Sequence, residues 1–406
     1  KWLRRPRVCS MANGCYHLIK NEDFKIRKVI QSLESSPIRK IANTAIGKKD
    51  IIPLYFGETD IPTPSFISQE MKNALDAGHT FYSANQGIPE LVNTVSKYTS
   101  SLHKNNIDPS RIMITSAGMN ALMIASQAII NPRDKVICIT PVWPNFMRCI
   151  EIMGGEVIEI PLIYSDTNNK WNLNIEEIKK HIKDVKAIYI NSPNNPTGWM
   201  MNKKEQMEIL KLCRKNKTWI VSDEVYERIV YDRNVAPSFL DLTDENDLLL
   251  VANSFSKSWA MTGWRLGWIV VPKNLLSIFE KLNEYNVASP SSPAQYAGIK
   301  AINDGEEFLK TMIDNFSINR DLVMKRLSAF SRITLPLPEA AFYAYFKVED
   351  VTDSEKFCIE TLDKTSVGLA PGSAFGKGGD GWIRLCYAKS PDLLNQAFDK
   401  LKPVLT

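Results

Sequence analysis

The chain has 406 residues, a formal net charge of +5 and 44% hydrophobic residues, and this length is enough for two domains with large cores. Its basic residues are dispersed among 45 acidic residues, a pattern that argues against nucleic-acid binding. No apolar run approaches the roughly 18 residues of a membrane span, so we expect no membrane partner. Seven cysteines without a Cys-x-x-Cys pair predict neither a disulfide framework nor a metal site.

The first twenty residues contain five basic and no acidic side chains, which is typical of an organelle transit peptide. The free cysteines favour a reducing compartment instead. We therefore expect a cytoplasmic protein in which residues 1–19 are a leader or extension, with organelle targeting as the alternative.

Short runs rich in Val and Ile alternate with helical patterns through the middle of the chain, which predicts a parallel sheet with helical crossovers. Several of these runs are apolar throughout, as expected for strands covered on both faces. The predicted strands are 111–115, 135–140, 156–161, 186–191, 218–223, 248–254 and 266–271. The clearest helices between them are 118–130, 174–182 and 203–216.

From about residue 301 the pattern changes to helices with a few strands, among them 341–348 and 381–386. We therefore predict an α/β fold with a seven-stranded, mostly parallel sheet and a smaller α+β domain. Residues 59–300 form the large domain in this prediction. Residues 20–58 and 301–406 together form the small one.

Polar residues follow several predicted strands at their carboxyl ends, where open parallel sheets bind ligands. Residues 116–120 lead straight into a helix, so they offer backbone amides to a phosphate or form an ordinary turn. Trp143 places a flat aromatic ring at the same edge, unless it is a core residue. Asn195 lies in the turn 191–198, which directs an amide side chain back over the strand ends.

Asp223 ends a predicted buried strand and needs a partner there, because an unpaired buried carboxylate is costly. A protonated pyridine nitrogen would be a suitable partner, and Tyr226 could then reach the phenolic oxygen of the same ring. Capping of a helix N-terminus is the alternative role for Asp223.

Lys257 is preceded by Ser254 and Ser256 and followed by Arg265, a phosphate clamp built around an amine. Such an amine can form a Schiff base with the aldehyde of pyridoxal phosphate, whose ring acts as an electron sink for chemistry at the α carbon of an amino acid. A solvated surface lysine is the alternative. The apolar runs on both sides of this segment favour the first interpretation, because they place Lys257 where a buried strand ends.

Taken in this order, the motifs resemble the class I and II aminotransferase family, the aspartate-aminotransferase-like branch of the fold-type-I pyridoxal-phosphate enzymes. The resemblance extends from about residue 30 to residue 402. The matching segments are residues 57–64, 82–91, 195–198, 222–226, 253–267 and 371–385.

The resemblance implies a catalytic role for three residues. Lys257 would carry pyridoxal 5'-phosphate and shuttle the proton, and Asp223 would keep the pyridine nitrogen protonated. Tyr226 and Asn195 would bind the phenolate oxygen of the ring, while Trp143 would stack on its face.

The resemblance also implies the binding residues. Arg384 would bind the substrate α-carboxylate through a bidentate fork, and Asn195 and Gly57 would complete the substrate site. Tyr82 would reach the phosphate from a second subunit, so that a homodimer shares its active sites. The remaining phosphate ligands would be Ala117, Gly118, Met119, Ser254, Ser256 and Arg265.

The function implied is transfer of an amino group between an L-amino acid and a 2-oxo acid, with 2-oxoglutarate as the expected acceptor, by a ping-pong mechanism through the Lys257 Schiff base. The alternatives are a lyase or a synthase on the same scaffold, or a regulator that binds the cofactor without turnover. Residues 286–292 contain no basic side chain where the animal and enteric-type aspartate aminotransferases place a second arginine. The resemblance therefore leaves the amino donor open.

Overall fold

The computed structural model describes residues 26–406. The predicted leader or extension at residues 1–19 lies outside the described residues. Residues 26–34, which contain α1 (Lys28–Gln31), form a unit of their own, and residues 35–406 form a second unit. The features below all belong to the second unit.

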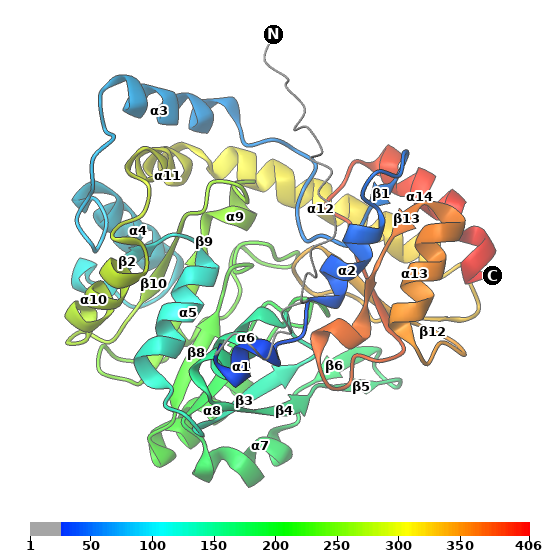
Figure 1. The fold of residues 1–406 in the computed structure, drawn as a ribbon, viewed down its shortest axis with the longest axis horizontal. Coiled ribbons are helices and arrows are strands. Elements are labelled where there is room, and N and C mark those ends of the chain that lie inside the picture. The colour runs from blue at the N-terminus through cyan, green and yellow to red at the C-terminus, as the bar shows by residue number, and fades with distance from the viewer. Residues whose placement is uncertain (1–25) are drawn as a thin grey trace, which may run out of the picture. The chain divides into compact units, whose positions relative to one another are not determined.

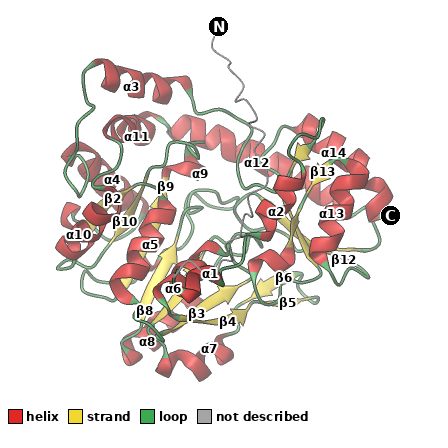
Figure 2. Ribbon diagram, in the orientation of Figure 1, coloured by secondary structure: helices red, strands yellow, loops and turns green. Residues whose placement is uncertain are grey.

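All the predicted strands of the central region occur, and they form one seven-stranded sheet (Figures 1 and 2). Within this sheet β10 alone runs opposite to the other six strands, so the prediction of a mostly parallel sheet is confirmed. In spatial order the strands are β2 (Ile112–Thr115), β10 (Gly267–Val270), β9 (Leu249–Ser254), β8 (Trp219–Asp223), β7 (Ala187–Asn191), β3 (Lys135–Thr140) and β4 (Glu156–Pro161).

The seven-stranded sheet is buried on both faces, and this explains its runs of Val and Ile. Successive residues of a strand point to opposite faces, and in β3 Ile137 and Ile139 join one hydrophobic core while Val136 and Cys138 join another. The predicted crossover helices are present as α5 (Gly118–Ile129), α7 (Ile175–His181) and α8 (Lys203–Asn216).

A four-stranded sheet lies in the C-terminal part of the chain, where the sequence predicted a few strands, residues 341–348 and 381–386 among them. Its order is β11 (Ile333–Thr334), β12 (Tyr343–Val348), β15 (Trp382–Cys386) and β14 (Ala370–Pro371). The helices of this part are α12 (Glu306–Leu327), α13 (Ser354–Thr365) and α14 (Pro391–Leu405).

The segment before residue 58 pairs with this C-terminal part. β1 (Ile52–Pro53) runs parallel to β13 (Val367–Gly368), and α2 (Pro37–Thr44) packs against β14. The domain boundaries at residues 58 and 300 stay a prediction.

The other helices and strands connect these parts or cover them. They are α3 (Ser65–Asp76), α4 (Pro89–Leu102), α6 (Asn145–Met153), β5 (Ile163–Ser165), β6 (Lys170–Asn172), α9 (Phe255–Ser258), α10 (Leu276–Val287), α11 (Ser292–Asp304) and short 3₁₀ turns. None of the described helices is long and apolar enough to cross a membrane.

Candidate active site

A pocket of ≈ 330 Å³ lies where the carboxyl ends of β7, β8 and β9 meet residues from the four-stranded sheet. Every residue that the sequence predicted for the site lines this pocket, except Ala117 and Tyr82. The predicted residues that line it are Gly57, Gly118, Met119, Trp143, Asn195, Asp223, Tyr226, Ser254, Ser256, Lys257, Arg265 and Arg384.

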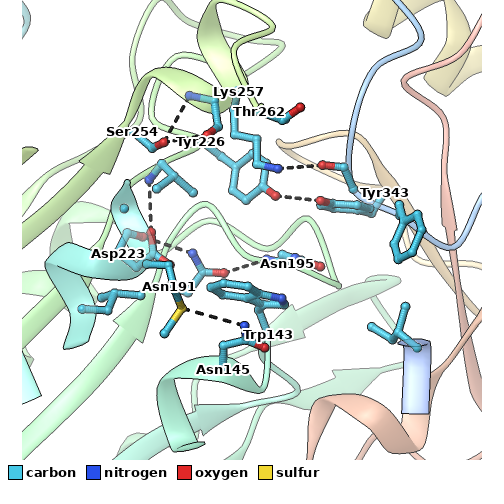
Figure 3. Close-up of a pocket in the computed structure, with 18 of the residues that line it drawn as sticks. Trp143, Asn145, Asn191, Asn195, Asp223, Tyr226, Ser254, Lys257, Thr262 and Tyr343 are labelled. Carbon is cyan, nitrogen blue, oxygen red and sulfur yellow. Dashed lines mark hydrogen bonds between the residues drawn. The ribbon is translucent and has the colours of Figure 1, made fainter. Parts of the chain in front are cut away.

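Lys257 lies on the short helix α9, directly after Ser254 ends β9. Its side chain is partly buried, and Nζ donates a hydrogen bond of 2.6 Å to the backbone oxygen of Gly57 (Figure 3). Burial lowers the pKa of Lys257 to about 8. The amine therefore loses its proton far more readily than an ordinary lysine, as a nucleophile requires, and Lys257 is not a solvated surface charge.

Asp223 ends β8 and is only 3% exposed. Its carboxylate accepts hydrogen bonds from the Tyr189 hydroxyl (3.1 Å) and from the backbone N–H of Val225 (3.3 Å). Among the described residues no basic side chain forms a salt bridge with it, and burial raises the pKa of Asp223 to about 6. The residues after Asp223 form turns rather than a helix, so the alternative of a helix N-cap is wrong.

Tyr226 is buried, and its hydroxyl lies 2.6 Å from the hydroxyl of Tyr343 on β12 (Figure 3). A Cβ added to Gly57 would lie 2.0 Å from the same Tyr343 oxygen. Glycine at position 57 therefore allows the backbone carbonyl that accepts from Lys257 to approach the tyrosine pair closely.

Arg384 lies on β15 and is buried. One terminal nitrogen donates to Asn195 Oδ1 at 2.8 Å and the other donates to the backbone oxygen of Tyr55. Nε of Arg384 is buried and has no acceptor among the described residues. A carboxylate entering the pocket would supply this acceptor, because it can receive two parallel bonds from a guanidinium.

The opposite side of the pocket has the features of an anion site. α5 begins at Gly118 after Ala117, whose φ of 118° is unusual for a residue with a side chain. A Cβ on Gly118 would lie 3.2 Å from Cβ of Ser254, so glycine lets the N-terminus of α5 come close to the end of β9. Exposed amides at a helix N-terminus, the serine hydroxyls and Arg265 together favour a phosphate.

A network of buried polar side chains holds Ser254 in place. Its backbone N–H donates to Asn253 Oδ1 at 2.8 Å, and Asn253 Nδ2 donates to Glu227 Oε1 at 2.6 Å. His103 lies 3.3 Å from the other oxygen of Glu227. Ser254 Oγ in turn donates to Ser256 Oγ at 2.9 Å, so the two serines of the predicted phosphate clamp are held in a fixed relation.

Tyr82 lies apart from the pocket of its own chain and is 88% exposed. The neighbouring residue Ser83 is fixed, since its N–H donates to Ser289 Oγ at 3.3 Å and its hydroxyl accepts from Gln295 Nε2 at 3.0 Å. An exposed tyrosine on an anchored loop agrees with a role in a second subunit, which stays a prediction.

The family described as aminotransferase class I and II matches residues 49–401. The chain belongs to the class I and II aminotransferases. An aspartate aminotransferase of Pyrococcus abyssi is 34% identical over 375 residues, which cover 91% of this chain and 95% of the relative. The aromatic-amino-acid aminotransferase 2 of Thermococcus litoralis is 33% identical and covers 93% and 97%, respectively.

A solved aspartate aminotransferase of Thermotoga maritima has the same fold as this aminotransferase, with a TM-score of 0.87, 32% identity and coverage of 94% of this chain and 100% of that chain. The predicted family, fold class and enzyme activity are confirmed. The relatives bear names with different amino acids, so they leave the donor of this aminotransferase open.

Several residues that line the pocket, and Tyr189 beside it, were not predicted. Tyr343 and Tyr189 contact Tyr226 and Asp223 but lie in runs that read only as apolar strands. Asn191 lies in the predicted turn 191–198, and its side chain accepts from the N–H of Asn195 at 2.8 Å; that turn was the available signal. Arg39, Tyr55 and Phe56 carry no motif at all.

Proposed function

We propose that this aminotransferase binds pyridoxal 5'-phosphate covalently through Lys257 Nζ and transfers an amino group from an L-amino acid to 2-oxoglutarate in two half-reactions of a ping-pong cycle. The observation that carries the proposal is the partly buried Lys257 amine of lowered pKa, in one pocket with Asp223 and Arg384. When bound, the cofactor withdraws electrons from the substrate α carbon.

The residues around Lys257 have complementary tasks in this proposal. Lys257 would accept the α proton of the substrate and return it during the transfer. Asp223 would hold a proton on the ring nitrogen of the bound cofactor, which would give its buried carboxylate the cation that it lacks among the described side chains. Tyr226 and Asn195 would donate to the ring oxygen, and Trp143 would pack against the ring.

The proposed phosphate site joins two elements. The N-terminus of α5 provides backbone amides. The end of β9 and the residues that follow it provide two hydroxyls and a guanidinium. The residues are Ala117, Gly118, Met119, Ser254, Ser256 and Arg265.

We expect sodium borohydride to fix the cofactor irreversibly on Lys257 and to remove the visible absorption band of the purified protein. Peptide mapping by mass spectrometry then locates the reduced cofactor. Lys257→Ala should carry no fixed cofactor, whereas Lys273→Ala, which removes a surface lysine paired with Glu245, should be labelled like the wild type. Reduced cofactor on another lysine of the wild-type protein would refute the proposal.

We further propose a two-fold symmetric homodimer in which Tyr82 of each subunit reaches the phosphate held by the other. Closed two-fold symmetry is the commonest state of soluble oligomers, and one interface then completes both sites. The exposed Tyr82 on its anchored loop supports this arrangement.

Subunit exchange tests this arrangement. Inactive Lys257→Ala protein is mixed with Tyr82→Ala protein at limiting cofactor, and exchange is followed by mass. A mixed dimer carries both lesions in one site and none in the other, so activity should exceed the sum of the parents. Replacing Tyr82→Ala by Tyr285→Ala, which truncates another exposed tyrosine, controls for the loss of an exposed ring. Complete exchange without a gain in activity would place Tyr82 outside the partner's site.

A further inference from the structure

The pocket contains one positive charge more than the proposed roles use. Four basic residues line it, and Asp223 is the acidic residue among its described lining. Lys257 carries the cofactor, Arg265 faces its phosphate and Arg384 binds the α-carboxylate. Asp223 is engaged by the ring nitrogen. The fourth basic residue, Arg39, has no role so far.

Arg39 reaches the pocket because α2 is anchored on its other side. Ser36 caps α2, and its Oγ accepts from the backbone N–H of Arg39 at 3.4 Å. α2 packs against β14, whose residue Ala370 is paired with Arg384 on β15. The helix residues buried in the core are Ile38, Ile41 and Ala42.

Three successive residues, 55–57, contact Arg384, Arg39 and Lys257 in turn. The backbone oxygen of Tyr55 accepts from Arg384, the ring of Phe56 lies 5.2 Å from the guanidinium carbon of Arg39, and the oxygen of Gly57 accepts from Lys257. Arg39, Arg384 and Lys257 line the same pocket, so a substrate held at Arg384 and Lys257 has Arg39 as a further cation in the wall around it.

The guanidinium of Arg39 is available for a ligand. Its neighbour Lys40 forms a salt bridge with Glu355, but among residues 26–406 no carboxylate forms a salt bridge with Arg39. The cation–π contact with Phe56 uses no N–H hydrogen bond of the guanidinium, so these groups are free to donate to a ligand.

We infer that Arg39 binds a second carboxylate on the substrate, so that the substrates are dicarboxylic amino acids and 2-oxo acids. This inference rests on the proposed function. A guanidinium binds a carboxylate through two parallel hydrogen bonds, and the contact with Phe56 holds the Arg39 guanidinium at the wall of the pocket. Arg39 thereby supplies the distal charge that residues 286–292 lack.

The test compares glutamate with glutamine, which has the same shape without the distal charge. Steady-state kinetics of the holoenzyme are measured with both donors for wild type, Arg39→Gln, Arg39→Lys and the control Lys40→Gln. The ratio of kcat/KM for glutamate to that for glutamine should fall about 10- to 100-fold in Arg39→Gln, as expected when a hydrogen-bonded charge loses its partner. It should fall less in Arg39→Lys and stay unchanged in Lys40→Gln.

A binding measurement reads the same contact without turnover. Calorimetric titration of the holoenzyme with glutarate, a five-carbon dicarboxylate without an amino group, should give a Kd about tenfold or more higher in Arg39→Gln than in wild type. The inference would be overturned if Arg39→Gln lowered kcat/KM equally for glutamate and glutamine, so that their ratio stayed unchanged. A greater loss of kcat/KM for phenylalanine than for glutamate would also overturn it. A wild-type protein that binds glutarate through Arg39 but transfers no amino group would refute the proposed function alone.

Discussion

Asp223→Asn is expected to lower the rate of proton abstraction from amino acids by about a thousandfold or more, in the range seen when a preorganised electrostatic partner is lost. A carboxylate in this position can hold a proton on the cofactor ring nitrogen, whereas an amide cannot. The rate is measured in a single half-reaction by stopped-flow absorbance. Cofactor binding should change far less, because Lys257 and the phosphate site are intact.

The same substitution should stabilise the cofactor-free protein. Burial raises the pKa of Asp223 from its usual 3.8 to about 6, so the folded state binds more protons than the unfolded state between these values. Stability is therefore lost as pH rises through this window, by roughly 3 kcal/mol in total above pH 6. Asparagine carries no such cost.

The stability effect is checked by urea unfolding of the cofactor-free proteins at pH 5 and pH 8. The advantage of Asp223→Asn over wild type should be larger at pH 8 than at pH 5. Wild-type half-reaction rates in the variant would refute the role of Asp223, and a variant that unfolds more easily at both pH values would show that the carboxylate has its partner within the protein.

Arg384→Lys is expected to lower kcat/KM by about two powers of ten or more, equivalent to about 3 kcal/mol of transition-state stabilisation. An ammonium cannot keep the bonds to Asn195 and Tyr55 and also offer a planar fork to the substrate. The loss should be similar for alanine, phenylalanine and glutamate, because all three share the α-carboxylate.

Steady-state kinetics with these three donors test the role of Arg384. Arg326→Lys is a suitable control, since Arg326 is a surface arginine that pairs with Asp399, and it should show wild-type kinetics. A loss confined to glutamate would mean that Arg384 binds the distal carboxylate instead, and Arg39 would then be the candidate for the α-carboxylate.

The sequence predicted the central sheet well, because strands covered on both faces must be apolar along their whole length. β3 and β4 begin and end at the predicted residues, whereas β7 begins one residue later than predicted. The α5 and α8 helices were also predicted from their helical pattern, and in the structure Asn202 and Glu205 form a capping box at the start of α8.

Reasoning from strand ends alone could predict only those site residues that follow strands within one sheet, whereas Gly57 and Arg384 were expected from the family resemblance. Asp223 and Lys257 meet this condition, since their strands β8 and β9 are adjacent and parallel. Tyr343 does not, because it lies on another sheet and 117 residues from Tyr226. Arg39 likewise arrives through the packing of α2, which local sequence patterns do not encode.

Residues 55–57 contact both Arg384, which we propose binds the substrate, and Lys257, which we propose binds the cofactor. Two backbone oxygens in this short segment accept from Arg384 and from Lys257, so a ligand that changes one contact alters the position available to the other. Such a coupling is reciprocal. If a carboxylate bound to Arg384 weakens the hydrogen bond between the Lys257 amine and Gly57, then formation of that hydrogen bond weakens carboxylate binding by the same factor. If the proposed function is correct, binding of the substrate carboxylate and release of the Lys257 amine are therefore parts of one equilibrium.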